Sequence, residues 1–247
     1  MQNLLSSPDH PFVKRWVRLR LDRKSRVQEG ACLLTSPREI LEVGQHGALL
    51  VLISTPDTPL DEFAPFEARR HVLVTPQLMA KITGLAAPVG VAAEVALPKP
   101  GTDLGRWPLI LDGVSDPGNV GSLLRTALAL GWSSAVLLPG TADPFNEKTL
   151  RASKGAAFRL PLLQRTAEQL VEEMANKGLP LCIADMEGEA PKSQRPNGCG
   201  LLLGHETRGV QHWKAGMRVH VPQSGEIESL NVAVAGGILM ASLRGVV

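Results

Sequence analysis

Residues 109–125 read Leu-Ile-Leu-Asp-Gly-Val-Ser-Asp-Pro-Gly-Asn-Val-Gly-Ser-Leu-Leu-Arg, and this stretch decides the fold class. Its apolar start, Leu109–Leu111, predicts a buried strand. Asp116 is a favourable N-cap, and Pro117 suits the first helical position because the N–H that it lacks would be unbonded there. The apolar residues that follow predict a helix that Gly131 ends. A strand, a tight turn and a helix in this order are typical of an α/β protein.

The rest of the C-terminal half continues this alternation. Strands are predicted at residues 135–138, 181–184, 200–203 and 218–221. Helices are predicted at 166–176, where Thr166 and Gln169 form a capping box, and at 230–243. Strands that alternate with helices imply a mostly parallel sheet with helices on both faces. A ligand site is expected in the loops at the carboxyl ends of these strands.

Residues 97–105 carry two prolines and two glycines between apolar segments, which is the composition of a linker. We place the linker at 99–107, between a small α/β domain over 1–98 and a larger domain over 108–247. The small domain begins with a predicted amphipathic helix that is strongly basic from Lys14 to Arg26. Its basic residues are Lys14, Arg15, Arg18, Arg20, Arg23, Lys24 and Arg26. Such a run suits a phosphate backbone, and a solvated helix face is the alternative.

Composition bounds the possible classes of protein. The chain has 247 residues, 44% of them apolar and 20% charged, which are ordinary values for a globular protein. Cys32, Cys182 and Cys199 form no C-x-x-C pair and the His residues form no H-x-x-x-H pair, so no metal site is expected. The N-terminus lacks the pattern of a signal peptide, and no apolar run is long enough to span a bilayer. We therefore expect a cytoplasmic protein with reduced cysteines.

Three segments place glycines, polar residues or charges where an apolar run stops: residues 116–125, 201–209 and 219–232. Taken singly, each has a structural explanation. Arg125 lies in an otherwise apolar helix, which favours a structural ion pair. Glu206 fits an exposed loop carboxylate, and Ser229 fits the N-cap of the last helix. The chain contains neither G-x-G-x-x-G nor G-x-x-x-x-G-K-[ST], which argues against a nicotinamide oxidoreductase or a P-loop enzyme.

Taken together and in this order, the three segments resemble the motifs of the SpoU (TrmH) branch of the SPOUT RNA methyltransferases. The resemblance covers about residues 109–243 and includes Arg151-Ala-Ser-Lys-Gly155. The first domain is similar to the substrate-binding domain that often precedes the catalytic domain of this family. Thr35-Ser36 stands where many relatives have Glu-Gly, and His205 stands where Asn is common. These departures concern the choice of substrate more than the type of reaction.

The resemblance implies both a fold and a reaction. The fold is an α/β sheet with a deep trefoil knot near its C-terminus, assembled as a homodimer. The reaction is methyl transfer from S-adenosylmethionine to a ribose 2′-hydroxyl of transfer or ribosomal RNA, without a metal. By motif position, the implied cofactor-binding residues are Leu203, Gly204, Val221, Pro222 and Leu230, and the implied catalytic residues are Asn119, Arg125, Glu206, Ser229 and Asn231.

Arg125 matches the catalytic arginine of this family. Because a guanidinium almost never gives up its proton, we expect Arg125 to orient the ribose or its phosphate and to stabilise developing alkoxide charge. Two alternatives stay open at this point. A catalytically inert RNA- or ribosome-binding protein of the same fold would carry nearly identical loops. An enzyme of the same superfamily could also methylate a base nitrogen instead of a ribose.

Overall fold

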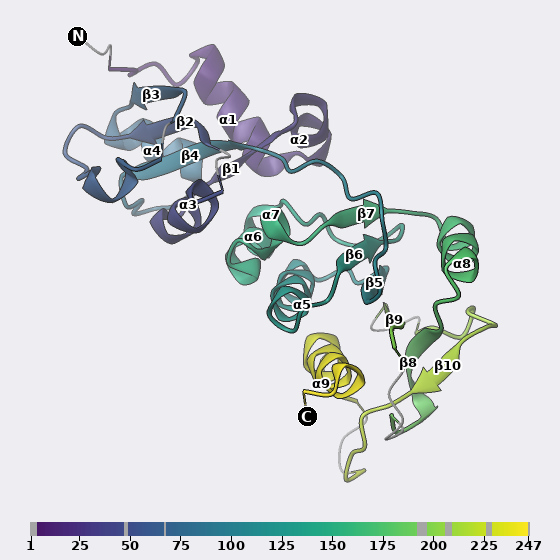
Figure 1. Ribbon diagram of the computed structural model, residues 1–247. Helices are drawn as coiled ribbons and strands as arrows, with labels where there is room; N and C mark the ends of the chain where they lie inside the picture. Colours follow the sequence, from purple (N-terminus) through teal and green to yellow (C-terminus); the bar gives the residue numbers. More distant parts are fainter. Residues whose placement is uncertain are drawn as a thin grey trace. The chain divides into compact units, whose positions relative to one another are not determined.

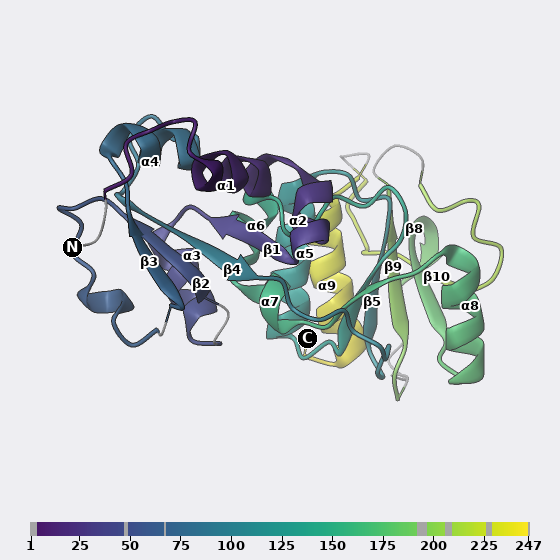
Figure 2. The ribbon, with the colours of Figure 1, turned by 90° about the horizontal axis from the view of Figure 1, so that it is seen from above.

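The computed structural model describes residues 4–46, 49–66, 68–191, 197–205, 209–225 and 229–246. The chain divides into two compact units (Figure 1, Figure 2). The first comprises residues 1–99 and 145–158, and the second comprises residues 100–144 and 159–247. Residues 145–158, which the sequence assigned to the second domain, group with the first because helix α6 (Glu147–Ser153) packs on strand β1 (Ala31–Leu34). Within the described residues, no helix is long and apolar enough to cross a membrane.

The first unit is a four-stranded sheet with helices packed on it. Its strands are β1, β2 (Leu49–Ser54), β3 (Arg70–Leu73) and β4 (Val91–Ala96), in the order β1-β4-β2-β3. The β2–β3 pair is parallel, and β4 pairs with β1 and β2 in antiparallel fashion. Its other elements are α1 (Pro11–Leu21), α2 (Arg23–Glu29), α3 (Pro37–Gly44), the 3-10 turn η1 (Asp61–Phe63), α4 (Pro76–Thr83), α6 and the start of α7 (Ala156–Arg159). The core forms where Trp16 of α1 and Ile82 of α4 pack against Leu33 and Ile53 of the sheet.

Asp22 divides the predicted basic helix into α1 and α2. Its backbone is extended, with φ −113° and ψ 119°, so α1 ends there. Its carboxylate then accepts hydrogen bonds from the Lys24 and Ser25 backbone N–H groups at 3.2 and 2.9 Å, which caps α2. The prediction of one continuous helix is therefore wrong at this residue. A capping signal within the basic run outweighs the helical pattern around it.

Glu39 of α3 is a buried carboxyl, only 4% exposed. Burial raises its pKa to about 7, and the positive charges of Arg151 and Lys154 on α6 offset this effect only in part. Glu147 of α6 adds to the rise in pKa through charge repulsion. The folded-state pKa of Glu39 lies above that of the unfolded chain. The contribution of this group to the free energy of unfolding is therefore fully present at low pH and is lost as the pH rises through 7.

Glu39→Gln is therefore expected to raise the free energy of unfolding by roughly 2 kcal/mol at about pH 8 and to change it little at about pH 4.5. Glutamine keeps an acceptor for the Thr35 backbone N–H but carries no charge to desolvate. Urea unfolding of both proteins across this pH range measures the difference. A difference that stays constant with pH would contradict burial of a charge as the cause.

The second unit is a six-stranded sheet in which every described pairing is parallel. Its strands run in the order β10-β8-β9-β5-β6-β7. Its elements are β5 (Pro108–Asp112), α5 (Pro117–Ala129), β6 (Ser134–Leu137), β7 (Leu162–Gln164), α8 (Ala167–Asn176), β8 (Leu181–Glu189), β9 (Gly200–Gly204), β10 (Met217–Val219) and α9 (Val232–Arg244). The predicted mostly parallel sheet is confirmed. The sequence missed β7, whose three residues are too few to show a pattern.

Helices cover both faces of this sheet. Successive residues of a strand point to opposite faces. Leu202 of β9 joins a buried cluster with Leu170 and Met174 of α8. Its neighbour Leu203 faces α9, since a Cβ added at Gly236 would lie 2.6 Å from the Leu203 side chain. The α/β prediction with helices on both faces therefore agrees with the described packing.

Helices α5 and α9 lie side by side and run in the same direction (Figure 1, Figure 2). Their starts are joined by a hydrogen bond between Asn119 and Asn231. At the other end, Arg244 Nε donates to the carbonyl that follows α5 at 3.2 Å. Between these points, a Cβ on Gly236 would lie 2.6 Å from the Leu123 side chain, so glycine permits a close approach. This packing brings the segment before α9 to the turn between β5 and α5.

Candidate active site

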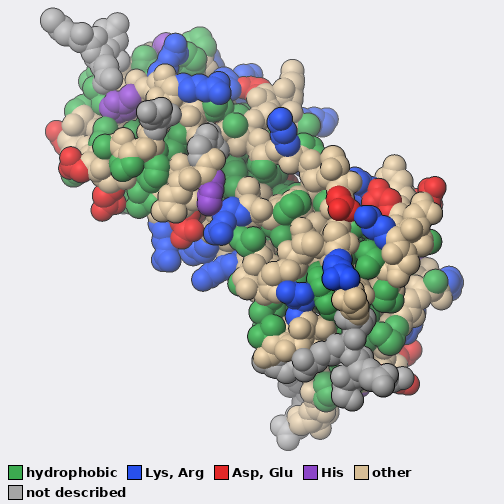
Figure 3. Space-filling model, viewed as in Figure 1, with side chains coloured by type: hydrophobic (Ala, Val, Ile, Leu, Met, Phe, Trp, Pro, Cys, Tyr) green, Lys and Arg blue, Asp and Glu red, His purple; other side chains and the backbone are tan. Residues whose placement is uncertain are grey.

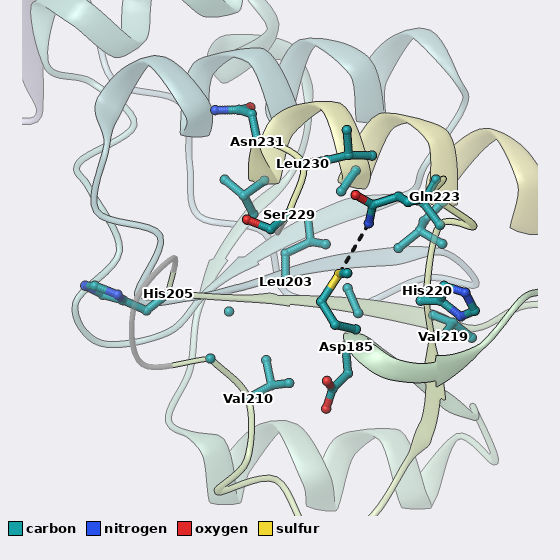
Figure 4. Close-up of a pocket in the computed structure, with 18 residues that line it drawn as sticks. Asp185, Leu203, His205, Val210, Val219, His220, Gln223, Ser229, Leu230 and Asn231 are labelled. Atoms are coloured by element: carbon teal, nitrogen blue, oxygen red, sulfur yellow. Dashed lines mark hydrogen bonds between the residues drawn. The ribbon is translucent and has the colours of Figure 1, made fainter. Parts of the chain in front are cut away.

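A cavity of about 320 Å³ opens at the carboxyl ends of β8 and β9 (Figure 4). Its lining residues lie at 184–186, 203–205, 209–210, 219–221, 223, 229–232, 235 and 239. Most of them belong to the second and third segments that the sequence singled out. The sheet therefore gathers these two segments around one cavity, at the edge where a parallel topology places ligands.

Four of the five residues implied to bind the cofactor line this cavity: Leu203, Gly204, Val221 and Leu230. Pro222 is not among the lining residues, although the residues on either side of it are. A proline between two lining residues fixes the backbone there without adding a hydrogen-bond donor.

Gly204 ends β9 opposite Asp112 of β5, and the chain soon returns to it. The Gly209 N–H donates to the His205 carbonyl at 2.9 Å. A Cβ at position 204 would overlap the Val210 side chain and would lie 2.9 Å from the Gly209 carbonyl oxygen. The close return of the chain therefore requires glycine here, and the returning residues form part of the cavity wall.

Residues of the first and third segments meet beside the cavity. Asn231 Nδ2 donates to Asn119 Oδ1 at 3.0 Å, across 112 residues of sequence. Asp116 accepts a hydrogen bond from the Asn119 backbone N–H at 2.9 Å, which fixes Asn119 in the first turn of α5. Asn231 and Ser229 both line the cavity (Figure 4). Glu206 lies outside the described residues.

Asn231, not Ser229, caps α9. Its Oδ1 accepts hydrogen bonds from the Ala233 and Val234 backbone N–H groups at 2.9 and 3.3 Å. The helix therefore begins at Val232, two residues after the predicted start. The assignment of Ser229 as the N-cap is wrong, and Ser229 is exposed at the cavity instead.

Asn231→Ala is expected to lower the free energy of unfolding by about 1 kcal/mol more than Asn231→Ser, because serine can still cap the helix. Both variants lose the hydrogen bond to Asn119. Urea unfolding of the two variants and the wild type measures the difference. Equal losses in the two variants would mean that the bridge to Asn119, and not the cap, accounts for the stability at this position.

Arg125 lies on α5 and is exposed. Within the described residues, no hydrogen bond or ion pair joins its side chain to another residue. Arg125 is not among the residues that line the cavity. The structural ion pair that its sequence position favoured is therefore not found in the described part of the chain.

The cavity wall is held by a network of polar contacts that the sequence did not predict. Asp112 at the end of β5 accepts a hydrogen bond from Trp213 Nε1 at 2.7 Å, and its carboxylate lies 2.8 Å from His212 Nε2. Arg218 of β10 pairs with Asp185, which lines the cavity, and donates to the Trp213 carbonyl at 3.1 Å. These contacts hold the returning loop against the sheet. The one available signal was an aspartate directly after an apolar strand.

Two further lining residues carry hydrogen-bonding atoms without a partner. Within the described residues, Gln223 Oε1 and His220 Nδ1 are buried and unpaired. Apolar side chains, among them Leu203, Val219 and Leu239, form much of the remaining wall. Such a cavity fits S-adenosylmethionine, because adenine needs apolar walls and a few hydrogen bonds. Among the residues that the structure describes, no group of three or more His, Cys, Asp or Glu side chains could hold a metal ion.

The basic residues of α1 and α2 divide into buried and exposed ones. Arg26 is 3% exposed and donates to backbone carbonyls of α1 at 2.8 and 2.9 Å. Arg15 pairs with Glu29 and with the buried Glu94 of β4. Burial of Arg26 corrects its assignment as a phosphate contact, whereas Arg15 is partly exposed and its assignment stays a prediction. Those that remain exposed are Lys14, Arg18, Arg23 and Lys24, whereas Arg20 is largely covered and lies 3.7 Å from Glu147.

The sequence and the fold both resemble known proteins. Residues 107–241 match the model of the SpoU rRNA Methylase family. The chain is 35% identical to the 23S rRNA (guanosine(2553)-2′-O)-methyltransferase RlmP of Bacillus subtilis, over 98% of this chain and 99% of that protein. It is 26% identical to the SpoU methyltransferase AviRb from Streptomyces viridochromogenes, solved in complex with AdoMet, with a TM-score of 0.81 over 96% of this chain and 97% of that one. It shares its fold with an AdoMet-bound rRNA methyltransferase from Sinorhizobium meliloti, at 24% identity and a TM-score of 0.83 over 98% and 97% of the two chains.

Proposed function

Since this chain belongs to the SpoU rRNA methylase family, we propose that it transfers a methyl group from S-adenosylmethionine to a ribose 2′-hydroxyl of ribosomal RNA. The observation that carries this proposal is the hydrogen bond between Asn119 and Asn231 beside the cavity. It joins the first and third motifs where a cofactor and a ribose have to meet. RlmP, which is similar over nearly the whole chain, is named for 23S rRNA, and this favours ribosomal over transfer RNA.

When bound, S-adenosylmethionine supplies a methyl group on a positively charged sulfur that is already a good leaving group. The chain has to hold the ribose and to stabilise its oxygen as the hydroxyl loses its proton. We assign the charge stabilisation to Arg125, because its exposed guanidinium stays protonated. Asn119, Ser229 and Asn231, together with Glu206 of the second motif, position the nucleotide.

The trefoil knot and the homodimer are parts of this proposal. The path of the chain supports the knot, since the segment after β10 leads to α9, which packs on both α5 and β9. The surface of α9 supports the dimer. Val234 and Ile238 are 51% and 42% exposed there and lie one turn apart, so they form an apolar stripe suited to a second copy.

The first unit is proposed to bind the RNA. Figure 3 shows Lys and Arg side chains over the region of α1 and α2. The exposed basic residues of these helices are Lys14, Arg18, Arg23 and Lys24. Exposed positive charge suits the RNA backbone, and phosphate contacts of this kind make binding depend on salt.

Replacing Arg18, Arg23 and Lys24 together by alanine is expected to weaken RNA binding and to reduce its salt dependence. The slope of log affinity against log salt should fall by about two to three, roughly one for each phosphate contact that is lost. The affinity for a ribosomal RNA fragment, measured between about 50 and 200 mM salt, gives this slope. Cofactor affinity should not change, which controls for folding. An unchanged slope would show that these side chains are only solvated.

Mapping ribose methylation across cellular RNA, with and without the protein, tests the proposed function. We expect a ribosomal position to lose its methyl group in the absence of the protein. Purified protein and S-adenosylmethionine should restore it in vitro. RNA binding without cofactor binding would favour the inert RNA-binding alternative, and a methyl group on a base nitrogen would assign the chain a different reaction.

A further inference from the structure

Gln223 holds a buried oxygen that has no hydrogen-bond partner among the residues that the structure describes. The residue follows β10, and its side chain points into the cavity near Leu230 (Figure 4). Within the described residues, its Oε1 is buried without a hydrogen-bond partner, while its Nε2 donates to the Met186 sulfur at 3.4 Å. A thioether is a weak acceptor, so the carboxamide as a whole is poorly satisfied. A buried polar group in this condition requires an explanation, and its position in the cavity points to a ligand.

We propose that Gln223 recognises the adenine ring of the cofactor, with its Oε1 accepting a hydrogen bond from the 6-amino group. This inference rests on the proposed function. A carboxamide presents an acceptor beside a donor, and adenine presents a donor and an acceptor side by side, so the two groups match. The neighbouring side chains of Met186 and Leu230 are apolar and suit the faces of a heterocycle.

The amino-acid end of the cofactor fits this position less well. Its ammonium and carboxylate groups are charged, and burial of either one requires an opposite charge nearby. The lining carboxylate of Asp185 is already paired with Arg218. Gln223 itself is neutral. A neutral ring that carries an N–H donor is therefore the part of the cofactor that this side chain selects.

The test measures binding rather than activity. The full chain is titrated calorimetrically with S-adenosylhomocysteine and with an analogue in which hydrogen replaces the 6-amino group. The wild type should bind the parent ligand about tenfold more tightly than the analogue, because one buried hydrogen bond is lost. Gln223→Met keeps the length of the side chain but removes the amide, so it should bind both ligands with the weaker affinity. Gln164→Met, the same change at an exposed residue of β7, should keep the tenfold gap.

Two results would overturn the assignment of Gln223. The wild type could bind the two ligands equally, or Gln223→Met could keep the gap between them while weakening both by the same factor. The last result would mean that the side chain shapes the cavity without recognising the amino group. If the wild type binds neither ligand, the proposed function itself fails, so that failure is distinguishable from failure of this inference.

Discussion

Arg125→Ala is expected to lower the single-turnover rate of RNA methylation by roughly 10²–10³-fold while leaving cofactor affinity unchanged. Removal of one fixed donor from a site of developing negative charge has effects of this size in enzymes. The side chain is exposed and has no partner within the described residues, so its loss should not affect folding. Methyl transfer at saturating cofactor measures the chemical step, and calorimetry with S-adenosylhomocysteine measures binding.

Arg125→Lys is the matched control for this experiment. Lysine keeps the positive charge but lacks the planar fork of donors, so its rate should lie between those of the wild type and the alanine variant. All three proteins should unfold at the same urea concentration. An alanine variant that folds, binds cofactor and methylates RNA at the normal rate would remove Arg125 from the mechanism.

The pattern of helices and strands is predictable where a local signal determines it. Asp116 and Pro117 mark the start of α5, and Thr166 with Gln169 forms the capping box at the start of α8. The strands β5 and β9 are largely apolar because parallel strands are covered on both faces. Each of these signals involves residues close together in the sequence, so no knowledge of distant contacts is needed.

The start of α9 is not predictable in this way. Ser229 and Asn231 are both good N-caps, and the local sequence does not rank them. Asn231 is selected because its amide also reaches Asn119, which lies 112 residues away. The role of Arg26 depends on tertiary contacts for a similar reason. The helix break at Asp22 lets the guanidinium of Arg26 reach carbonyls of α1, and a charge pattern alone cannot show this contact.

The residues of the candidate site also fall into two groups, those that the local sequence identifies and those whose role depends on contacts in the folded chain. Leu203, Gly204 and Leu230 lie in motifs, so the sequence alone identifies them as candidates for the cavity. Gln223 and Asp112 lie in or beside the same motifs, but their importance depends on what surrounds them. The burial of the Gln223 oxygen and the contacts of Asp112 with the returning loop exist only once the loop is folded.

Gly204→Ala is expected to weaken S-adenosylhomocysteine binding by roughly a hundredfold. The added methyl group would overlap Val210 and lie 2.9 Å from the Gly209 carbonyl oxygen. Relief requires residues 209–210, which line the cavity, to move away from β9. Overpacking of this kind costs roughly 1–3 kcal/mol, and about 1.4 kcal/mol corresponds to a tenfold change in affinity. Isothermal titration measures the loss, and methylation at low cofactor concentration should fall with it.

Gly237→Ala makes the same chemical change in α9, at a position with room for it. A Cβ there would lie 3.7 Å from the Thr126 methyl group, which is an ordinary contact. Helix propensity favours alanine over glycine by up to about 1 kcal/mol, so this variant should bind cofactor as the wild type does and unfold at a slightly higher urea concentration. If Gly204→Ala binds the ligand as tightly as Gly237→Ala, the close return of the chain at Gly204 does not shape the cavity, and the glycine there has a different cause.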